Sequence, residues 1–260
     1  MIPFGPAQTE ALHSLADIWR DTAFVLIGAA ALQCHLPAMR GTADLDITVA
    51  ASMDAFPSSL LSAGWFRNPR IEYEWCSPGG AKIDLIPAGP AHLQAGFLQW
   101  PSSGRRMNLA GLRHAFSHNQ SIDLSPAGAA ISVADLSVLA LLKIVAYLDR
   151  PSERRRDLGD LALILEEYLA CDDVRRWQDD VIAARIPYDC ASSFVLGRNL
   201  AAFVDGDEQT AIRTFLGKLR DENDPHASQT RMLHASPPSW SGAIESLLTR
   251  LDALERGLEA

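Results

Sequence analysis

Three aspartates, Asp44, Asp46 and Asp84, lie in two short segments whose apolar and polar residues alternate as in β-strands. In DLDITV, successive side chains point to opposite faces, so Asp44 and Asp46 share one face and the apolar residues share the other. Their Cα atoms are then about 6.5 Å apart, close enough for both carboxylates to reach one divalent cation. In KIDLIP, Asp84 stands between two apolar residues in the same way. Three such acids indicate metal-assisted phosphoryl chemistry, in which two ions about 3.5–4 Å apart stabilise the attacking and leaving oxygens.

The simpler interpretation of Asp44 and Asp46 is a pair of solvated acids at the start of a strand. A glycine nearby favours the metal site, because Gly28 follows the apolar segment FVLI and precedes a short helical segment. A residue without a β-carbon lets the backbone approach a phosphate, and a helix N-terminus attracts negative charge. Ala29 adds a backbone N–H that can bind phosphate. A tight turn without a ligand is the alternative for Gly28.

Two polar residues, Arg40 and Thr42, precede Asp44 in the predicted loop. Arg40 can contact a triphosphate through its planar set of donors. It can equally form an ion pair with Asp44 or Asp46 in the ligand-free protein. Both interpretations of Arg40 stay open.

Together, FVLIGAAAL, MRGTADLDI and KIDLIP resemble the motifs of the nucleotidyltransferase superfamily, in which a glycine turn and a helix precede an hDhDh strand and a later h[DE]h strand. Over residues 20 to 165 the sequence looks most like the AbiEii-type toxins and related bacterial nucleotidyltransferases. A departure is Ala29, where the family has serine or a second glycine. The resemblance implies substrate contacts from Gly28, Ala29, Arg40 and Thr42.

The same resemblance implies magnesium-dependent transfer of NMP from an NTP to an acceptor hydroxyl. Asp44 and Asp46 would hold two Mg²⁺ ions, and Asp84 would bind the catalytic ion and help to deprotonate the acceptor. Characterised relatives of the AbiEii-type toxins add nucleotides to RNA, notably tRNA ends, and are restrained by a cognate antitoxin. The expected partners are therefore an NTP, an RNA or tRNA acceptor and an antitoxin.

A buried lysine is predicted further along the chain. The helical segment LSVLALLKIVAYL is apolar except for Ser137 and Lys143, and a buried lysine is costly unless it meets an anion. LLKIVAYLDR followed by RRDLGDL resembles the family pattern K-x-x-A-x-x-x-R and [KR]D-x-x-D-L, which implies that Lys143 holds nucleotide phosphate and that Asp157 completes the site. The alternative is a structural ion pair between helices, with Asp157 and Asp160 one helical turn apart.

Composition limits the function classes. The chain has 260 residues, 48% of them hydrophobic, and a formal charge of −9, which argues against strong non-specific nucleic-acid binding. A local basic cluster at Arg154–Arg156 can still meet an RNA backbone. The four scattered cysteines, the absence of a leader-like N-terminus and the lack of an apolar run of about 20 residues predict a cytoplasmic protein without a membrane segment.

Periodicity predicts an α+β protein with two parts. Residues 1–130 are expected to form a nucleotidyltransferase-type domain, a mixed sheet flanked by helices, and residues 131–260 an all-helical domain. Strands are predicted at Phe24–Ile27, from Asp44, at Ile71–Trp75 and in a hairpin that presents Asp84. Three rival functions remain: a nucleotidyltransferase with a small-molecule, antibiotic-type acceptor, a catalytically silent module that binds nucleotide or a partner, and a metal phosphohydrolase that uses water as the acceptor.

Overall fold

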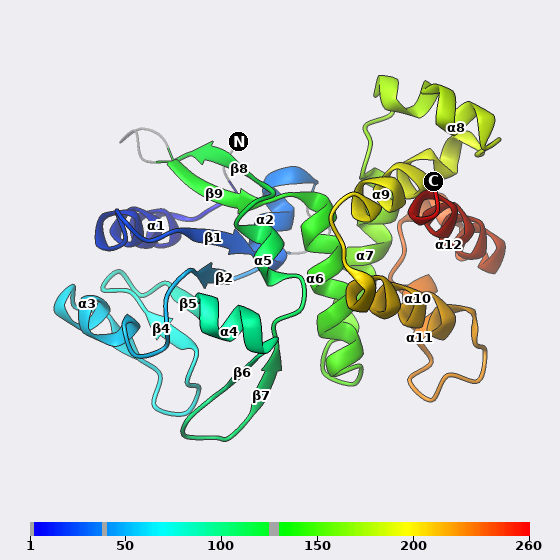
Figure 1. Cartoon of the computed structure of the whole chain (residues 1–260). Coiled ribbons are helices and arrows are strands. Elements are labelled where there is room, and N and C mark those ends of the chain that lie inside the picture. Colours follow the sequence, from blue (N-terminus) through cyan, green and yellow to red (C-terminus); the bar gives the residue numbers. More distant parts are fainter. Residues whose placement is uncertain (1–2, 38–40, 125–129) are drawn as a thin grey trace. The chain divides into compact units, whose positions relative to one another are not determined.

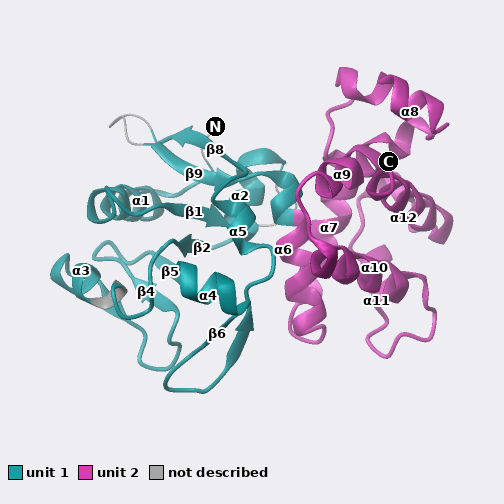
Figure 2. Cartoon of the chain, viewed as in Figure 1, with its two compact units in different colours: residues 1–139 teal, residues 140–260 magenta. Residues whose placement is uncertain are grey.

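The computed structural model describes residues 3–37, 41–124 and 130–260, which form two compact units (Figures 1 and 2). Unit 1 extends to Leu139 and contains the strands, and unit 2 begins at Ala140 and is built from helices. The predicted fold class, a mixed sheet with helices followed by a helical C-terminal part, is confirmed.

One mixed sheet organises unit 1. In the described residues its seven strands lie in the order β3-β4-β5-β2-β1-β9-β8. β2 is parallel to β5, and β1 is parallel to β9, whereas the other neighbouring strands are antiparallel. The strands are β1 (Phe24–Ile27), β2 (Asp44–Val49), β3 (Phe66–Arg67), β4 (Glu74–Cys76), β5 (Lys82–Pro87), β8 (Asn119–Asp123) and β9 (Ala130–Ala134).

Apolar and polar residues alternate along β2 and β5, so the sheet has an apolar face and an acidic face here. Leu45 and Ile83 are fully buried on the apolar face. Burying one such side chain contributes roughly 1.5–3 kcal/mol, so this face fixes the orientation of both strands. Asp46 and Asp84 consequently point to the opposite face.

Helices and a small ribbon complete the described part of unit 1. Leu12 and Leu15 of the first helix are fully buried, and Ser14 between them accepts a hydrogen bond from Trp65 Nε1 at 3.1 Å. The elements are α1 (Pro6–Ile18), α2 (Gly28–His35), α3 (Phe56–Ser62), α4 (Pro90–Ala95), α5 (Leu112–Ala115), β6 (Phe97–Gln99) and β7 (Arg106–Asn108).

The predicted strand Ile71–Trp75 is wrong in its first half. The Glu74 N–H donates to the Ile71 carbonyl at 3.1 Å, which closes a turn, and β4 begins only at Glu74. The strands at Phe24–Ile27 and from Asp44 are confirmed, and so is the hairpin that presents Asp84. The two or three residues of β3, β6 and β7 are too few to give a recognisable alternation.

Unit 2 contains a close helix–helix crossing. A β-carbon on Gly197 would lie 2.1 Å from the Leu254 carbonyl oxygen, and one on Gly257 would lie 2.0 Å from the Phe194 carbonyl oxygen. Glycine at both positions therefore lets α9 and α12 approach each other. The division between the units falls within α6. The helices are α6 (Leu136–Asp149), α7 (Arg155–Glu167), α8 (Asp179–Ala183), α9 (Ala191–Ala201), α10 (Gly206–Arg220), α11 (Ser228–His234), α12 (Ile244–Leu258) and the 3₁₀ turns η1 (Val174–Trp177), η2 (Tyr188–Cys190) and η3 (Pro238–Trp240).

The residue pattern of 174–185 predicts a single helix, but the structure forms η1 and α8 there instead. The Asp173 carboxylate accepts a hydrogen bond from the Arg175 N–H at 2.9 Å, which caps the 3₁₀ turn, and Gln178 is extended between the two elements. No helix in the described ranges is both long and apolar enough to cross a bilayer.

Candidate active site

The central feature of the acidic face is a pair of aspartates on neighbouring parallel strands. In the register of β2 and β5, Asp46 lies directly opposite Asp84, and both side chains are half-buried. Neighbouring strands are about 4.8 Å apart, so two carboxylates on the same face at this position lie side by side. Like charges this close favour a shared cation or proton.

Asp44 lies on the same face as Asp46 but at the exposed start of β2, opposite Lys82. Within the described residues, no three or more His, Cys, Asp or Glu side chains are grouped closely enough to hold a metal ion. The oxygen donors of Asp46 and Asp84 suit a hard divalent cation. Of the three predicted acids, Asp46 and Asp84 therefore form a pair, and Asp44 lies two residues before Asp46 in β2.

Gly28 lies against Asp46, one member of this pair. It begins α2 with φ +71°, and a β-carbon built on it would lie 2.0 Å from Asp46 Oδ2. Any other residue would be strained in this backbone conformation and would also displace the Asp46 carboxylate. Ala29 follows, half-buried, in the first turn of α2, where backbone N–H groups lack intrahelical partners.

Glu74 is an acidic neighbour that the motif analysis misses. It lies opposite Asp84 in the β4–β5 hairpin, so Asp46, Asp84 and Glu74 form a row across three neighbouring strands. Asn68 Nδ2 donates to Glu74 Oε1 at 2.5 Å. The turn at Ser77–Gly80, which fixes the hairpin register, is the sequence signal that could have placed Glu74 beside Asp84.

Of the two loop residues predicted to contact substrate, Arg40 and Thr42, the structure describes only Thr42. Arg40 lies outside the described residues. Thr42 is half-buried, and its hydroxyl donates to the Asp44 carbonyl oxygen at 3.1 Å. This bond fixes the entry of the chain into β2, and a substrate contact for Thr42 stays a prediction.

Lys143 has two acidic partners within unit 2. Its Nζ lies 2.6 Å from Asp160 Oδ2 and 3.1 Å from Asp157 Oδ1, and all three residues are buried. Burial alone would lower the pKa of Lys143, but the two carboxylates outweigh it and raise that pKa above its usual value. Asp157 Oδ2 is buried with no hydrogen-bond partner in the described part of the chain.

This arrangement matches the ion-pair alternative for Lys143. A nucleotide phosphate at Lys143 would lie beside two carboxylates, which would repel it. The phosphate-binding role of Lys143 and the role of Asp157 therefore stay predictions. The basic residues Arg154, Arg155 and Arg156 are exposed at the start of α7.

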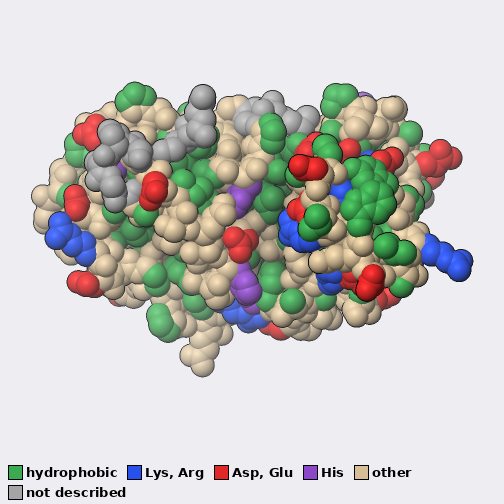
Figure 3. Space-filling view, turned by 90° about the horizontal axis from the view of Figure 1, so that it is seen from above, with side chains coloured by type: hydrophobic (Ala, Val, Ile, Leu, Met, Phe, Trp, Pro, Cys, Tyr) green, Lys and Arg blue, Asp and Glu red, His purple; other side chains and the backbone are tan. Residues whose placement is uncertain are grey.

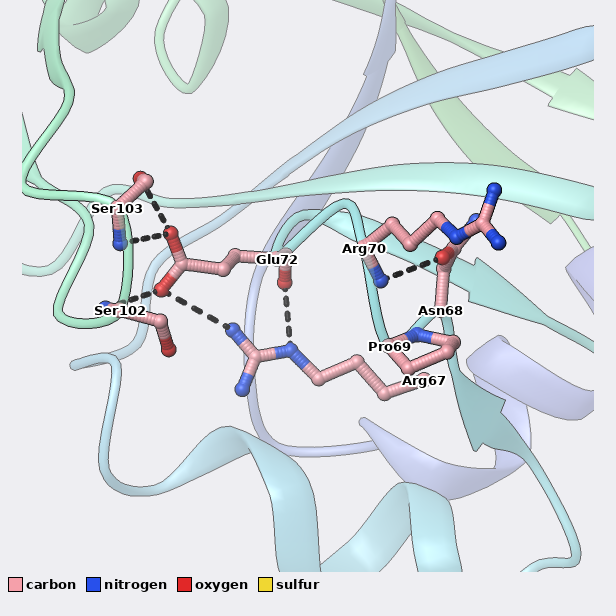
Figure 4. A pocket seen from close by; sticks show the side chains of 7 residues that line it. All are labelled: Arg67, Asn68, Pro69, Arg70, Glu72, Ser102 and Ser103. Atoms are coloured by element: carbon pink, nitrogen blue, oxygen red, sulfur yellow. Dashed lines mark hydrogen bonds and ion pairs between the residues drawn. The ribbon is translucent and has the colours of Figure 1, made fainter.

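A separate pocket lies in unit 1 between the β3–β4 connection and the β6–β7 turn (Figure 4). Its volume is about 320 Å³, and Glu72 joins its two sides. The Glu72 carboxylate accepts hydrogen bonds from the Ser102 and Ser103 N–H groups, at 2.6 and 3.0 Å, and from the Ser103 hydroxyl. Although desolvation opposes it, this hydrogen bonding lowers the pKa of Glu72 to about 2. The Glu72 carboxylate thus holds the β6–β7 turn against the β3–β4 connection.

Comparison with known proteins gives distant structural similarity alone. No family model and no curated protein matches the sequence. An antigenic nucleotidyltransferase-like protein from Paracoccidioides brasiliensis is 15% identical, with a TM-score of 0.41, covering 85% of this chain and 88% of its own. The antibiotic-resistance factor ANT(2'')-Ia is 12% identical, also with a TM-score of 0.41, covering 82% of this chain and 95% of its own. Similarity at this level does not assign a function to the chain.

Proposed function

We propose that this protein is a magnesium-dependent nucleotidyltransferase that moves NMP from an NTP to an acceptor hydroxyl. The observation that supports the proposal is the register of β2 and β5, which sets Asp46 opposite Asp84 with Gly28 against Asp46. Without a β-carbon, Gly28 lets the Asp46 carboxylate pack against the start of α2, where backbone N–H groups can bind phosphate. The motif resemblance on these same residues supplies the reaction class.

Magnesium suits this donor set because it prefers oxygen ligands and often takes one or two carboxylates, with substrate phosphates and water completing its shell. Asp46 and Asp84, which the register sets side by side, would hold a magnesium ion, and the resemblance adds Asp44 as a further ligand and a second ion. Bound magnesium would neutralise the phosphate charge during transfer.

The residues of the chain would orient the NTP phosphates and accept the proton of the acceptor hydroxyl. The acceptor hydroxyl oxygen attacks the α-phosphorus while the bond from that phosphorus to the departing pyrophosphate oxygen breaks. The hydroxyl proton passes to the Asp84 carboxylate, which acts as general base. Backbone N–H groups of Gly28 and Ala29, at the start of α2, would orient the phosphates.

Incubation with each α-labelled NTP, Mg²⁺ and cell extract tests the proposal by asking which molecule acquires label. Asp84→Asn should abolish labelling. Asp123→Asn is the matched control, because Asp123 is an exposed strand acid at the far edge of the same sheet. NTP binding without transfer by the wild-type protein would favour the silent-module rival.

The acceptor in this proposal is RNA, in particular a tRNA end, with the protein acting as a toxin restrained by an antitoxin. It rests on the resemblance and on the exposed cations of Arg154 and Arg155 at the start of α7. Charge reversal of both to Glu should weaken RNA labelling and relieve growth inhibition while NTP binding persists. Label on a small molecule such as an aminoglycoside, with growth unaffected, would instead identify the antibiotic-type rival.

A further inference from the structure

Four exposed apolar side chains are concentrated in one short stretch of unit 2. Val174, Trp177, Ile182 and Tyr188, here called the apolar ledge, are 78%, 62%, 58% and 45% exposed. Val174 and Trp177 are three residues apart in the 3₁₀ turn η1, where such side chains eclipse one another. Figure 3 shows hydrophobic, acidic and basic side chains near one another on the right of the view. Exposed apolar patches of this kind mark interaction surfaces.

The aromatic part of the ledge is held in place. The Trp177 and Tyr188 rings are 5.5 Å apart, and the Tyr188 hydroxyl donates to the Cys171 carbonyl at 2.7 Å. The buried guanidinium of Arg176 lies 4.9 Å from the Tyr188 ring centre and donates to the Leu169 carbonyl at 2.6 Å. A fixed aromatic surface loses little conformational entropy on binding, and Trp and Tyr dominate binding energy at interfaces.

The ledge is not needed to complete the core beneath it. That core already contains well-buried side chains from the chain after α7, from α8 and η2, and from α9 and α12: Leu169, Val181, Cys190, Ala191, Phe194, Val195 and Ala253. Replacing an exposed ledge side chain should therefore leave the fold intact.

The charges around the ledge are predominantly acidic. Asp172, Asp179 and Asp189 are exposed next to it. The ion pairs of the segment use other acids, since Arg175 pairs with Asp173 and Arg198 pairs with Asp180. The basic residues at this surface are the exposed Arg185, the partly exposed Arg175, which is paired, and Arg256 of α12, which donates to the Ala184 carbonyl and pairs with Asp252.

This charge pattern selects the occupant. RNA could stack bases on Trp177 and Tyr188, but its phosphates would meet the acidic rim. A second copy docking through the same patch would place acids against acids on a chain of net charge −9. We propose that the apolar ledge binds a segment of another protein that carries apolar side chains flanked by Lys or Arg. Such a segment buries the ledge and neutralises Asp172, Asp179 and Asp189.

Fluorescence anisotropy with a labelled helical peptide of Leu and Lys, apolar on one face, tests this inference on the full-length protein. Trp177→Ser should weaken binding about tenfold or more, as for an aromatic anchor. Asp179→Asn with Asp189→Asn should weaken binding and reduce its dependence on salt. Phe66→Ser is the matched control, because Phe66 is 57% exposed in unit 1. Thermal melting of each variant checks that the fold persists.

Three results would overturn the proposal. The first is equal peptide affinity of the Trp177→Ser and Phe66→Ser variants, or equal binding of a peptide in which Glu replaces Lys. The second is binding of labelled oligo(U) that Trp177→Ser abolishes, which would identify the ledge as an RNA surface. The third is a concentration-dependent dimer in sedimentation that Trp177→Ser dissociates, which would identify a second copy as the occupant. None of these measurements depends on nucleotidyl transfer.

Discussion

Asp46 of β2 and Asp84 of β5 face each other across neighbouring parallel strands, and the Gly28 backbone contacts the Asp46 side chain. Two segments distant in sequence thus place their carboxylates side by side on the acidic face. Substitutions at and around this pair separate its contribution to chemistry from its contribution to stability.

Gly28→Ala should reduce nucleotidyl transfer far more than it reduces stability. The added methyl would displace the Asp46 carboxylate, while the positive φ costs about 1–3 kcal/mol of folding free energy. Gly96→Ala is the matched control, since Gly96 has φ +72° with nothing within 4 Å of the added methyl. Transfer rates and denaturant unfolding of both variants measure the two effects. Equal loss of activity in both would show that Gly28 matters only as a turn.

Glu74→Gln should stabilise the magnesium-free protein. Glu74 lies opposite Asp84, and like charges directly across a strand pair destabilise by about 0.2–1 kcal/mol. The glutamine oxygen can still accept the Asn68 hydrogen bond. Thermal melting without metal measures the gain, and added Mg²⁺ should stabilise the variant less than the wild type. A lower melting temperature for the variant would mean that the Asn68 bond to Glu74 outweighs the repulsion.

Glu72→Gln should remove a pH-dependent contribution to stability. The folded-state pKa of Glu72 is lowered to about 2, and its unfolded value is about 4.3, so the ionised side chain stabilises the fold fully above the higher value. This stability is lost as the pH falls from about 4.3 to about 2. Denaturation across this window should show the wild type and the variant converging at low pH. Asp17→Asn, in an exposed pair with Arg20, is the control that should change little.

Lys143→Met should destabilise unit 2 by about 3–5 kcal/mol, because it leaves the buried Asp157 and Asp160 without a cation. Changing both acids to Asn in the same variant should restore much of the loss. Lys218→Met, which breaks a more exposed pair with Asp224, should cost less. Chemical denaturation measures all of these. A Lys143→Met protein of wild-type stability that binds NTP weakly would support the phosphate-binding role instead.

Local patterns in the sequence predicted the parts of the fold that local chemistry determines. The apolar run before Gly28, the DLD alternation and the turn at Ser77–Gly80 predicted β1, β2 and the hairpin that carries Asp84. The pairing of Asp46 with Asp84 depends on a parallel contact between distant strands, which no local pattern encodes. The sequence predicts Lys143 as a buried cation, but the identity of both its partners depends on the packing of α6 against α7.

The break between η1 and α8 shows the same limit. The 174–185 segment has helical composition, yet the Asp173 cap and the extended Gln178 interrupt it. The Asp173 cap is a local contact between residues two apart, whereas the extended Gln178 is a backbone detail that helical composition does not predict. Conversely, the Asp, Asn, Ser and Pro residues of 221–238 predict a mobile loop, yet this segment contains α11, whose Met232 is fully buried.

The most direct test of the central claim compares α-labelled and γ-labelled NTP in single-turnover reactions with Mg²⁺. The wild-type protein and the Asp123→Asn control should transfer the α-label to an acceptor and release the γ-label as pyrophosphate. The Asp46→Asn and Asp84→Asn variants should neither transfer the α-label nor release pyrophosphate. Transfer of the γ-label, release of the α-label as free NMP, or undiminished transfer by Asp84→Asn would contradict nucleotidyl transfer at the Asp46–Asp84 pair.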